Sequence, residues 1–234
     1  MTTIDDPHGR AVPADHVLSS LLDTRFSCRG FLDQPVDTGT ISRILELAQR
    51  SPSWCNTQSW QVIVTTGEAT DRLRVATSAF AATNPPIPDL PFPERYSGVF
   101  LDRRRECGRQ LYESVGIERG DREASARETL KNFSFFGAPH VAILTTERDH
   151  GVYGVLDCGV YLAHFLLAAQ SLGVATIPQA AFAAVAPVIR EQFDLPADRQ
   201  VLCGVSFGYP DDAHPANGFR TTRAAIDEIA TWAR

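Results

Sequence analysis

The sequence lacks an excess of basic residues. Its 234 residues include 22 lysines and arginines against 28 aspartates and glutamates, which gives a formal net charge of -6. A duplex nucleic acid would therefore be repelled by the chain as a whole. We expect no nucleic-acid partner, and any anion that binds must be small and held locally.

Paired cysteines are also missing. The five cysteines lie tens of residues apart, none of them forms a C-x-x-C pair, and their number is odd. This pattern fits neither a zinc site nor a disulfide framework. No metal site is predicted, and a reducing compartment is the simplest setting for these thiols.

Signals for export or membrane insertion are absent as well. The first ten residues, MTTIDDPHGR, are acidic and polar, whereas a secretory signal starts basic and continues apolar. The most apolar long segment, GVLDCGVYLAHFLLAAQSLGV, is interrupted by Asp157, His164 and Gln170, which are unfavourable in lipid. We expect a cytoplasmic protein with no membrane partner and no transmembrane segment.

The sequence contains no linker, no internal repeat and no nucleotide-binding fingerprint. A G-x-G-x-x-G after a strand, a P-loop and a strict alternation of strands and helices are all missing, which disfavours Rossmann and P-loop enzymes. The length is sufficient for one large core. We predict a flexible N-terminal segment over residues 1–14 and a single domain over residues 15–234.

Three stretches that are rich in apolar and β-branched residues predict buried strands: WQVIVTTG (60–67), HVAILTTE (140–147) and RQVLCGVSFG (199–208). Helical spacing predicts helices over residues 15–24 and 37–51. Thr38 or Thr40 could cap the second of these, which Pro52 would end.

Two further segments have a distinct character. Residues 83–98 contain many prolines and are predicted to be irregular, a possible flexible cover over a site, before a helical pattern that runs through Phe100 and Val115. Residues 153–172 are apolar on almost every side, which predicts a central helix surrounded by other elements and stopped by Gly173.

The stretch DTRFSCRGF (23–31) places two arginines and a serine at alternate positions. If it is extended, Arg25, Ser27 and Arg29 point the same way and could bind one anion, with a phosphate monoester as the best match. Alternatively, the arginines cap the preceding helix or form surface ion pairs with Asp23 and Asp33.

The stretch SPSWCNTQSW (51–60) crowds small, amide and aromatic side chains into a turn between a helix and a strand. Amides both donate and accept hydrogen bonds, so this turn could bind the N–H and C=O groups of a flat heterocycle, with Asn56 as the best candidate. It could equally be an ordinary turn with core tryptophans.

Cys158 is a poor candidate nucleophile, because burial in an apolar helix would raise its pKa.

Taken together, RFSCRGF and SPSWCNTQSWQVIV resemble the N-terminal signature of the flavin-dependent nitroreductase family, an R-x-S-x-R-x-F element before a P-S-x-x-N-x-Q-P-W turn. The likeness continues through FFGAPHVAIL, DCGVYLAHFLLAAQSLGVATIPQAAF and CGVSFGYPDDAHPANGFRTTRA, so it covers the chain from about residue 15 onward. Ser59 stands where the family usually has proline, which we expect to loosen the turn without removing a ligand.

The resemblance implies an α+β, nitroreductase-like fold: a central, mainly antiparallel β-sheet flanked by helices, in an intertwined homodimer with FMN at the subunit interface. It implies that Arg25, Ser27 and Arg29 hold the phosphate and ribityl end, that Arg220 and Arg223 complete the phosphate site, and that the turn comes from the partner subunit. The full set of implied cofactor-binding residues is Arg25, Phe26, Ser27, Arg29, Pro52, Ser53, Trp54, Asn56, Gln58, Pro178, Gln179, Ala180, Ala181, Arg220 and Arg223.

The implied activity is reduction of a nitroaromatic or a quinone by NADPH or NADH in a ping-pong reaction on FMN. The catalytic chemistry would belong to the flavin, with Arg29 stabilising the charge that develops near its ring. A cosubstrate that docks briefly over the flavin needs no dinucleotide domain. Two alternatives remain open: other flavin chemistry, such as reductive dehalogenation, enone reduction or flavin breakdown, and flavin binding or sensing without turnover.

Overall fold

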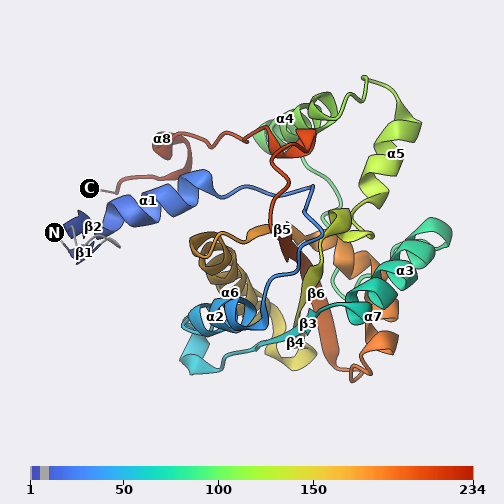
Figure 1. Cartoon of the computed structure of the whole chain (residues 1–234), viewed down its shortest axis with the longest axis horizontal. Coiled ribbons are helices and arrows are strands. Elements are labelled where there is room, and N and C mark those ends of the chain that lie inside the picture. The colour runs from blue at the N-terminus through green and yellow to red at the C-terminus, as the bar shows by residue number, and fades with distance from the viewer. Residues whose placement is uncertain (1, 6–10, 234) are drawn as a thin grey trace.

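The computed structural model describes residues 2–5 and 11–233 (Figure 1). Its helices are α1 (Ala14–Thr24), α2 (Thr38–Ala48), α3 (Glu68–Thr83), α4 (Gly98–Ser114), α5 (Arg122–Leu130), α6 (Gly151–Ser171), α7 (Ala186–Gln192) and α8 (Ile226–Ile229). Its strands are β1 (Thr3–Asp5), β2 (Ala11–Pro13), β3 (Trp60–Thr65), β4 (His140–Glu147), β5 (Ala175–Gln179) and β6 (Arg199–Gly208).

The central sheet has the strand order β3-β4-β6-β5, and every neighbouring pair in it is antiparallel. This confirms the predicted antiparallel sheet and its three predicted strands. The fourth strand, β5, was not predicted, because it is short and contains Pro178, which lacks the N–H that a central strand needs. Its place at the sheet edge explains why proline is tolerated there.

The sheet separates two apolar cores, and β4 shows how the sequence builds both. Val141 and Ile143 face the core under α3 and α7, while Ala142 and Leu144 face the core under α2 and α6. This is the alternation that a pleated strand imposes on successive side chains. Helices therefore cover both faces of the sheet, as Figure 1 shows.

Helix α2 buries Ile41, Ile44 and Ala48 on one stripe, as its helical spacing predicts. The predicted cap is wrong. The carboxylate of Asp37 accepts hydrogen bonds from the backbone N–H of Thr40 at 2.9 Å and from its hydroxyl at 2.6 Å, so the residue before the predicted candidates caps the helix. The helix also ends at Ala48, before Pro52.

Helix α6 packs against α2 and the sheet through Tyr161 and Phe165. It is not surrounded on all sides, because Val152 and Leu156 are 75% and 62% exposed. An 18-residue window within residues 148–171 has a mean hydropathy of 1.6, and the helix has the length to cross a membrane. In this structure, however, one of its faces packs into the core.

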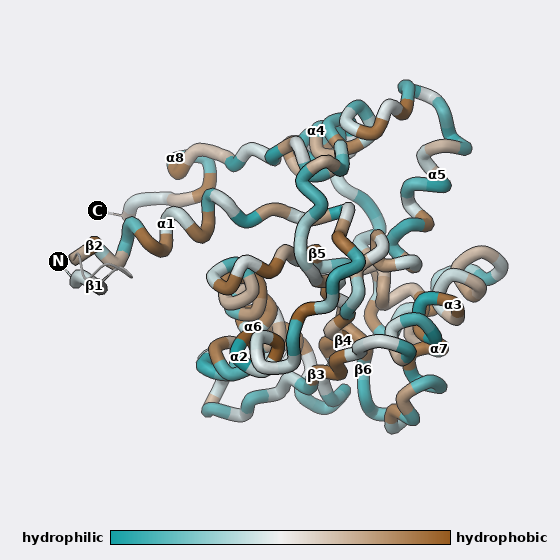
Figure 2. Tube along the Cα trace, in the orientation of Figure 1, coloured by the Kyte–Doolittle hydropathy of each residue, from teal (hydrophilic) through white to brown (hydrophobic). Residues whose placement is uncertain are grey.

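The two ends of the chain lie side by side, away from the sheet (Figure 1). Strands β1 and β2 pair in a small antiparallel ribbon that leads into α1, and α8 projects toward the same side of the molecule in Figure 1. Part of the N-terminal segment for which we predicted flexibility, residues 1 and 6–10, lies outside the described residues, and the single-domain assignment stays a prediction. Figure 2 shows apolar residues along this projecting part.

His140 gives the fold a predicted dependence on pH. Its side chain is 2% exposed, and its Nε2 accepts a hydrogen bond from the backbone N–H of Val36 at 2.9 Å. Burial lowers the pKa of the imidazole, so the unfolded chain takes up the proton first as the pH falls. The stabilising contribution is complete above the ordinary pKa of about 6.5 and is lost below it.

We therefore expect the free energy of unfolding to fall below pH 6.5 by up to about 1.4 kcal/mol per pH unit from this residue. Urea unfolding of the wild type and of His140→Gln at several pH values measures the effect. Equal slopes in the two proteins would contradict the assignment.

Candidate active site

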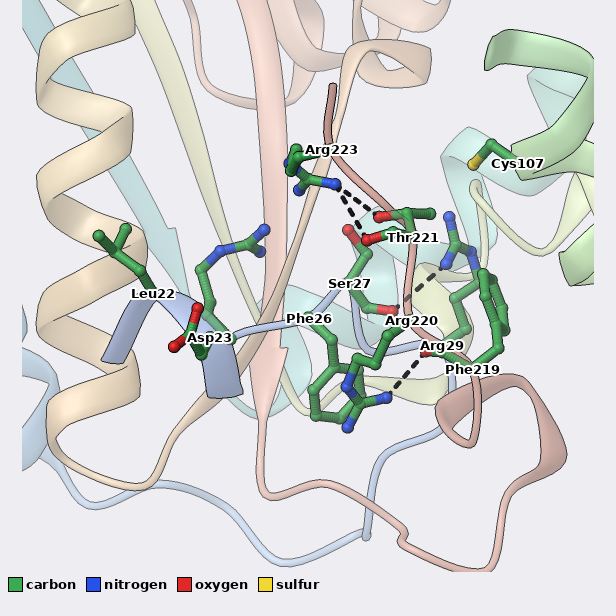
Figure 3. Close-up of a pocket in the computed structure, with 11 residues that line it drawn as sticks. Leu22, Asp23, Phe26, Ser27, Arg29, Cys107, Phe219, Arg220, Thr221 and Arg223 are labelled. Atoms are coloured by element: carbon green, nitrogen blue, oxygen red, sulfur yellow. Dashed lines mark hydrogen bonds between the residues drawn. The ribbon is translucent and has the colours of Figure 1, made fainter. Parts of the chain in front are cut away.

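A cavity of about 290 Å³ lies between the segment that follows α1 and the segment that precedes α8. Figure 3 shows its walls, with Arg220 over Phe26 and Arg223 beside Thr221. The lining residues are Leu22, Asp23, Arg25, Phe26, Ser27, Arg29, Cys107, Phe219, Arg220, Thr221 and Arg223. The five residues predicted for the phosphate and ribityl end thus share one cavity, together with Phe26 of the predicted cofactor-binding set.

The N-terminal wall is an extended segment fixed to the sheet edge. Ser27 forms a parallel bridge with Thr176 of β5, and the N–H of Cys28 donates to the carbonyl of Thr176 at 3.0 Å. The alternation of an extended chain turns the Cys28 side chain into the core, while Arg25, Ser27 and Arg29 line the cavity.

Asn217 joins the two walls across the sequence. Its Oδ1 accepts from the backbone N–H of Arg29 at 2.8 Å, and its Nδ2 donates to the carbonyls of Gly30 and Asp211, each at 2.9 Å. Gly30 is required here, because a Cβ at this position would lie 2.3 Å from the ring of His214. The sequence analysis missed Asn217, for which the only signal was an amide just before the basic stretch.

Replacing Asn217 by alanine is expected to lower the free energy of unfolding by about 2–3 kcal/mol, because one buried N–H and two carbonyls lose their partner. Asn84→Ala is the matched control, since that asparagine is exposed and bonds only near the end of α3, to Phe80 and Thr83. Urea unfolding at fixed protein concentration measures both. A loss no larger than that of the control would show that Asn217 does not join the walls.

The C-terminal wall presents two arginines that are held by nearby backbone. Arg220 donates to the carbonyl of Asn217 at 2.7 Å, and its guanidinium lies 3.9 Å from the centre of the Phe26 ring. Arg223 donates to the hydroxyl of Thr221 at 2.9 Å. These contacts leave other guanidinium N–H groups available, since each guanidinium carries five.

The arginines of the cavity form no ion pairs among the described side chains. Within residues 2–3 and 11–233, no carboxylate lies within 4.0 Å of the charged groups of Arg25, Arg29, Arg220 or Arg223. The alternative that Arg25 pairs with Asp23 or Asp33 is therefore wrong, although its backbone N–H does donate to Leu21 at the end of α1.

Arg25 contributes a buried hydrogen-bond donor to the cavity. Its Nη1 is buried and has no hydrogen-bond partner among the described residues. Burial and then the nearby charge of Arg223 lower the pKa of Arg25, and burial lowers the pKa of Arg29. A small, doubly charged anion with several acceptor oxygens would fit such a donor set.

The predicted turn lies elsewhere in the single chain. Pro52, Asn56 and Gln58 line a separate depression at the end of α2, and no residue of the turn lines the arginine cavity. Trp54 is exposed, and its ring meets that of Tyr153 edge-on at 4.3 Å.

The segment 178–181 also stays outside the cavity. Gln179 is buried, and its Nε2 donates to the carbonyl of Asn132 at 2.9 Å while its Oε1 accepts from Ser206 at 2.5 Å. Pro178 and Gln179 end β5, and Ala180 and Ala181 start the short 3-10 helix that follows. The Gln179 side chain is thus bonded within the core and does not face the arginine cavity.

Cys158 is a poor nucleophile in the structure as well. Burial raises the pKa of Cys158 to about 11, as predicted. Cys107 on α4 does line the arginine cavity, beside Arg29 and Arg223, which the sequence analysis did not foresee.

Known proteins resemble the whole of this architecture. A sequence profile described as "Nitroreductase family" matches residues 22–209. The nitroreductase NfnB of Mycolicibacterium smegmatis is 33% identical over 229 residues, 97% of each chain, and a 4-nitrobenzoate reductase of Nocardioides sp. is 32% identical over 227 residues, 95% of this chain and 92% of that protein.

Among solved structures, the FMN-dependent nitroreductase NfnB from Mycobacterium smegmatis, in complex with NADPH, superimposes with a TM-score of 0.91 at 33% identity. The match covers 95% of this chain and 100% of that one. The chain therefore belongs to the nitroreductase family, as its two N-terminal motifs predict.

Proposed function

We propose that the chain is an FMN-dependent NAD(P)H oxidoreductase that reduces nitroaromatic compounds. The observation that carries the proposal is the cavity in which four arginines meet: among the described side chains none of them pairs with a carboxylate, and one buried guanidinium nitrogen has no acceptor. The phosphate of FMN is a dianion with oxygens in the number and geometry that guanidinium groups bind. The names of its relatives agree, because they describe an FMN-dependent nitroreductase bound to NADPH and a 4-nitrobenzoate reductase.

The residues divide between the two ends of the cofactor. Arg25, Ser27, Arg220 and Arg223 would hold the phosphate, while Phe26 supports the Arg220 guanidinium. Arg29 would face the ring and stabilise negative charge there, because its half-buried guanidinium carries its charge in a weakly screened place.

The remaining predicted residues require a homodimer. Apolar side chains are exposed on α6, at Trp54 and along the terminal segments, where Trp232 is 77% exposed. A soluble chain rarely leaves such a surface uncovered. A partner on this surface would bring its turn, Pro52, Ser53, Trp54, Asn56 and Gln58, to the flavin, and the main chain of residues 178–181 would border the reactive edge.

Bound FMN would supply the two-electron chemistry of the reaction. In one turnover NAD(P)H gives a hydride, solvent gives a proton, and a nitro group becomes a nitroso group with release of water. The chain holds the ring with one face open, so that NAD(P)H and a flat nitroaromatic or quinone use the same space in turn, in a ping-pong order. Its five free thiols support a cytoplasmic site of action, and we propose no nucleic-acid or membrane partner.

Anaerobic flavin absorbance tests the proposal. The purified, FMN-loaded protein should lose its yellow colour with NADPH or NADH and regain it when a nitroaromatic is added. Initial rates at several concentrations of both substrates should give parallel double-reciprocal lines. Bleaching without recovery would point to other flavin chemistry, no bleaching would indicate a non-catalytic flavoprotein, and a protein that takes up no FMN would refute the proposal.

A further inference from the structure

Helix α6 carries a buried carboxylate that the proposed chemistry does not use. Asp157 is 7% exposed and lies among apolar residues of the helix. Burying a carboxylate is unfavourable unless hydrogen bonds replace those to water. Its partners therefore indicate what it does.

Those partners lie at two points of the turn between α2 and β3. The backbone N–H of Trp54 donates to the carboxylate at 3.1 Å and 3.3 Å, and the hydroxyl of Ser59 donates to it at 3.0 Å. One side chain of α6 thus holds the turn near its middle and at its end. The loosening expected from serine in place of proline is opposed by a hydrogen bond that proline cannot make.

The backbone between these two points is strained. Cys55, Asn56 and Gln58 have φ values of 50°, 56° and 52°, in the left-handed region that side chains other than glycine seldom adopt. Such conformations persist only where the surroundings enforce them. Inside the turn, Ser53 accepts from the N–H of Gln58 at 2.9 Å, but that bond does not connect the turn to the rest of the fold.

We infer that Asp157 is a positioning residue: with Ser59 it holds the turn in its left-handed conformation, so that the turn meets the flavin bound by the other subunit. The inference rests on the proposed function for its consequence, but the contact itself is a property of the single chain. Another contact of the turn with α6, the edge-on packing of Trp54 and Tyr153, lies one helical turn before Asp157 and also holds the turn against the helix.

The test compares Asp157→Ala, Asp157→Asn and Ser59→Ala with Ser171→Ala, a hydroxyl of the same helix that bonds only to Ala168. Deuterium uptake by residues 52–60 is measured without flavin, and FMN affinity and the visible circular dichroism of bound flavin are measured after loading. We expect Asp157→Ala to speed exchange in the turn, to weaken FMN binding roughly tenfold and to change the dichroism. Asp157→Asn should restore most of each property, since its amide can accept from Trp54 and pair with Ser59.

A fall in Tm with unchanged exchange, affinity and dichroism would overturn the inference, because Asp157 would then only support the fold. If Asp157→Ala does not fold, Ser59→Ala decides in the same way, with an expected two- to fivefold weaker binding of FMN. A wild type that binds no FMN would refute the proposed function, whereas the exchange of the flavin-free turn would still decide whether Asp157 fixes it.

Discussion

Replacing Arg25 and Arg220 together by alanine is expected to raise the Kd for FMN about a thousandfold. Each charge-assisted hydrogen bond contributes roughly 1.5–3 kcal/mol, so two lost partners of one phosphate amount to about 4 kcal/mol, or three orders of magnitude. Fluorescence titration of the flavin-free protein measures the change. The double variant should keep the same oligomeric state as the wild type.

The flavin-free form of this variant should unfold within about 1 kcal/mol of the wild type. It loses the contact of Arg220 with Phe26, but it also loses repulsion between the positive charges of Arg25 and Arg223. The control is Arg72→Ala with Arg105→Ala, which removes the same charge from exposed positions on α3 and α4. Equal affinities in the two double variants would mean that only net charge matters and that the cavity does not bind the phosphate.

Replacing Arg29 by glutamine is expected to make bound flavin harder to reduce. Arg29 would stabilise the negative charge that reduction places near the ring, so its loss should lower the midpoint potential by about 30–60 mV, which equals roughly 1.4–2.8 kcal/mol for two electrons. The value of kcat/KM for NADPH should fall roughly 10- to 100-fold. Spectroelectrochemistry of protein saturated with FMN measures the potential.

Arg29→Lys is the matched variant, because it keeps the positive charge but lacks the guanidinium group that donates to the carbonyl of Ser27. Its midpoint potential should lie close to that of the wild type, whereas its kcat/KM for NADPH should be restored to a smaller extent. If the glutamine and lysine variants share one potential, Arg29 does not act through its charge. If neither differs from the wild type, its role is confined to the wall of the cavity.

Much of the fold could be predicted because local pattern and tertiary packing agree. Strands β3, β4 and β6 and helix α2 show their periodicity in the sequence, and the packed structure keeps it. Strand β5 could not be predicted, since its pairing with β6, from Ala175 with Gly208 to Gln179 with Gly204, joins residues far apart in the sequence and Pro178 argues against a strand. The open side of α6 was missed because an apolar helix looks the same whether its own chain or a second copy covers it.

The candidate site, too, could be predicted only in part from the sequence. Alternation along an extended chain was enough to group Arg25, Ser27 and Arg29. Their meeting with Arg220 and Arg223 was available only from the family resemblance, because Asn217 makes that connection over 188 positions of sequence. Asp157 is visible in the sequence as a carboxylate in an apolar helix, but the sequence could not show which backbone N–H donates a hydrogen bond to it.

The most direct test of the central claim compares FMN with riboflavin, which has the same ring and ribityl chain but no phosphate. If arginines from both ends of the chain bind the phosphate, FMN should bind the wild type at least about a hundredfold more tightly, and the Arg25→Ala, Arg220→Ala variant should lose most of that preference. Equal affinities of the wild type for FMN and riboflavin would contradict the account.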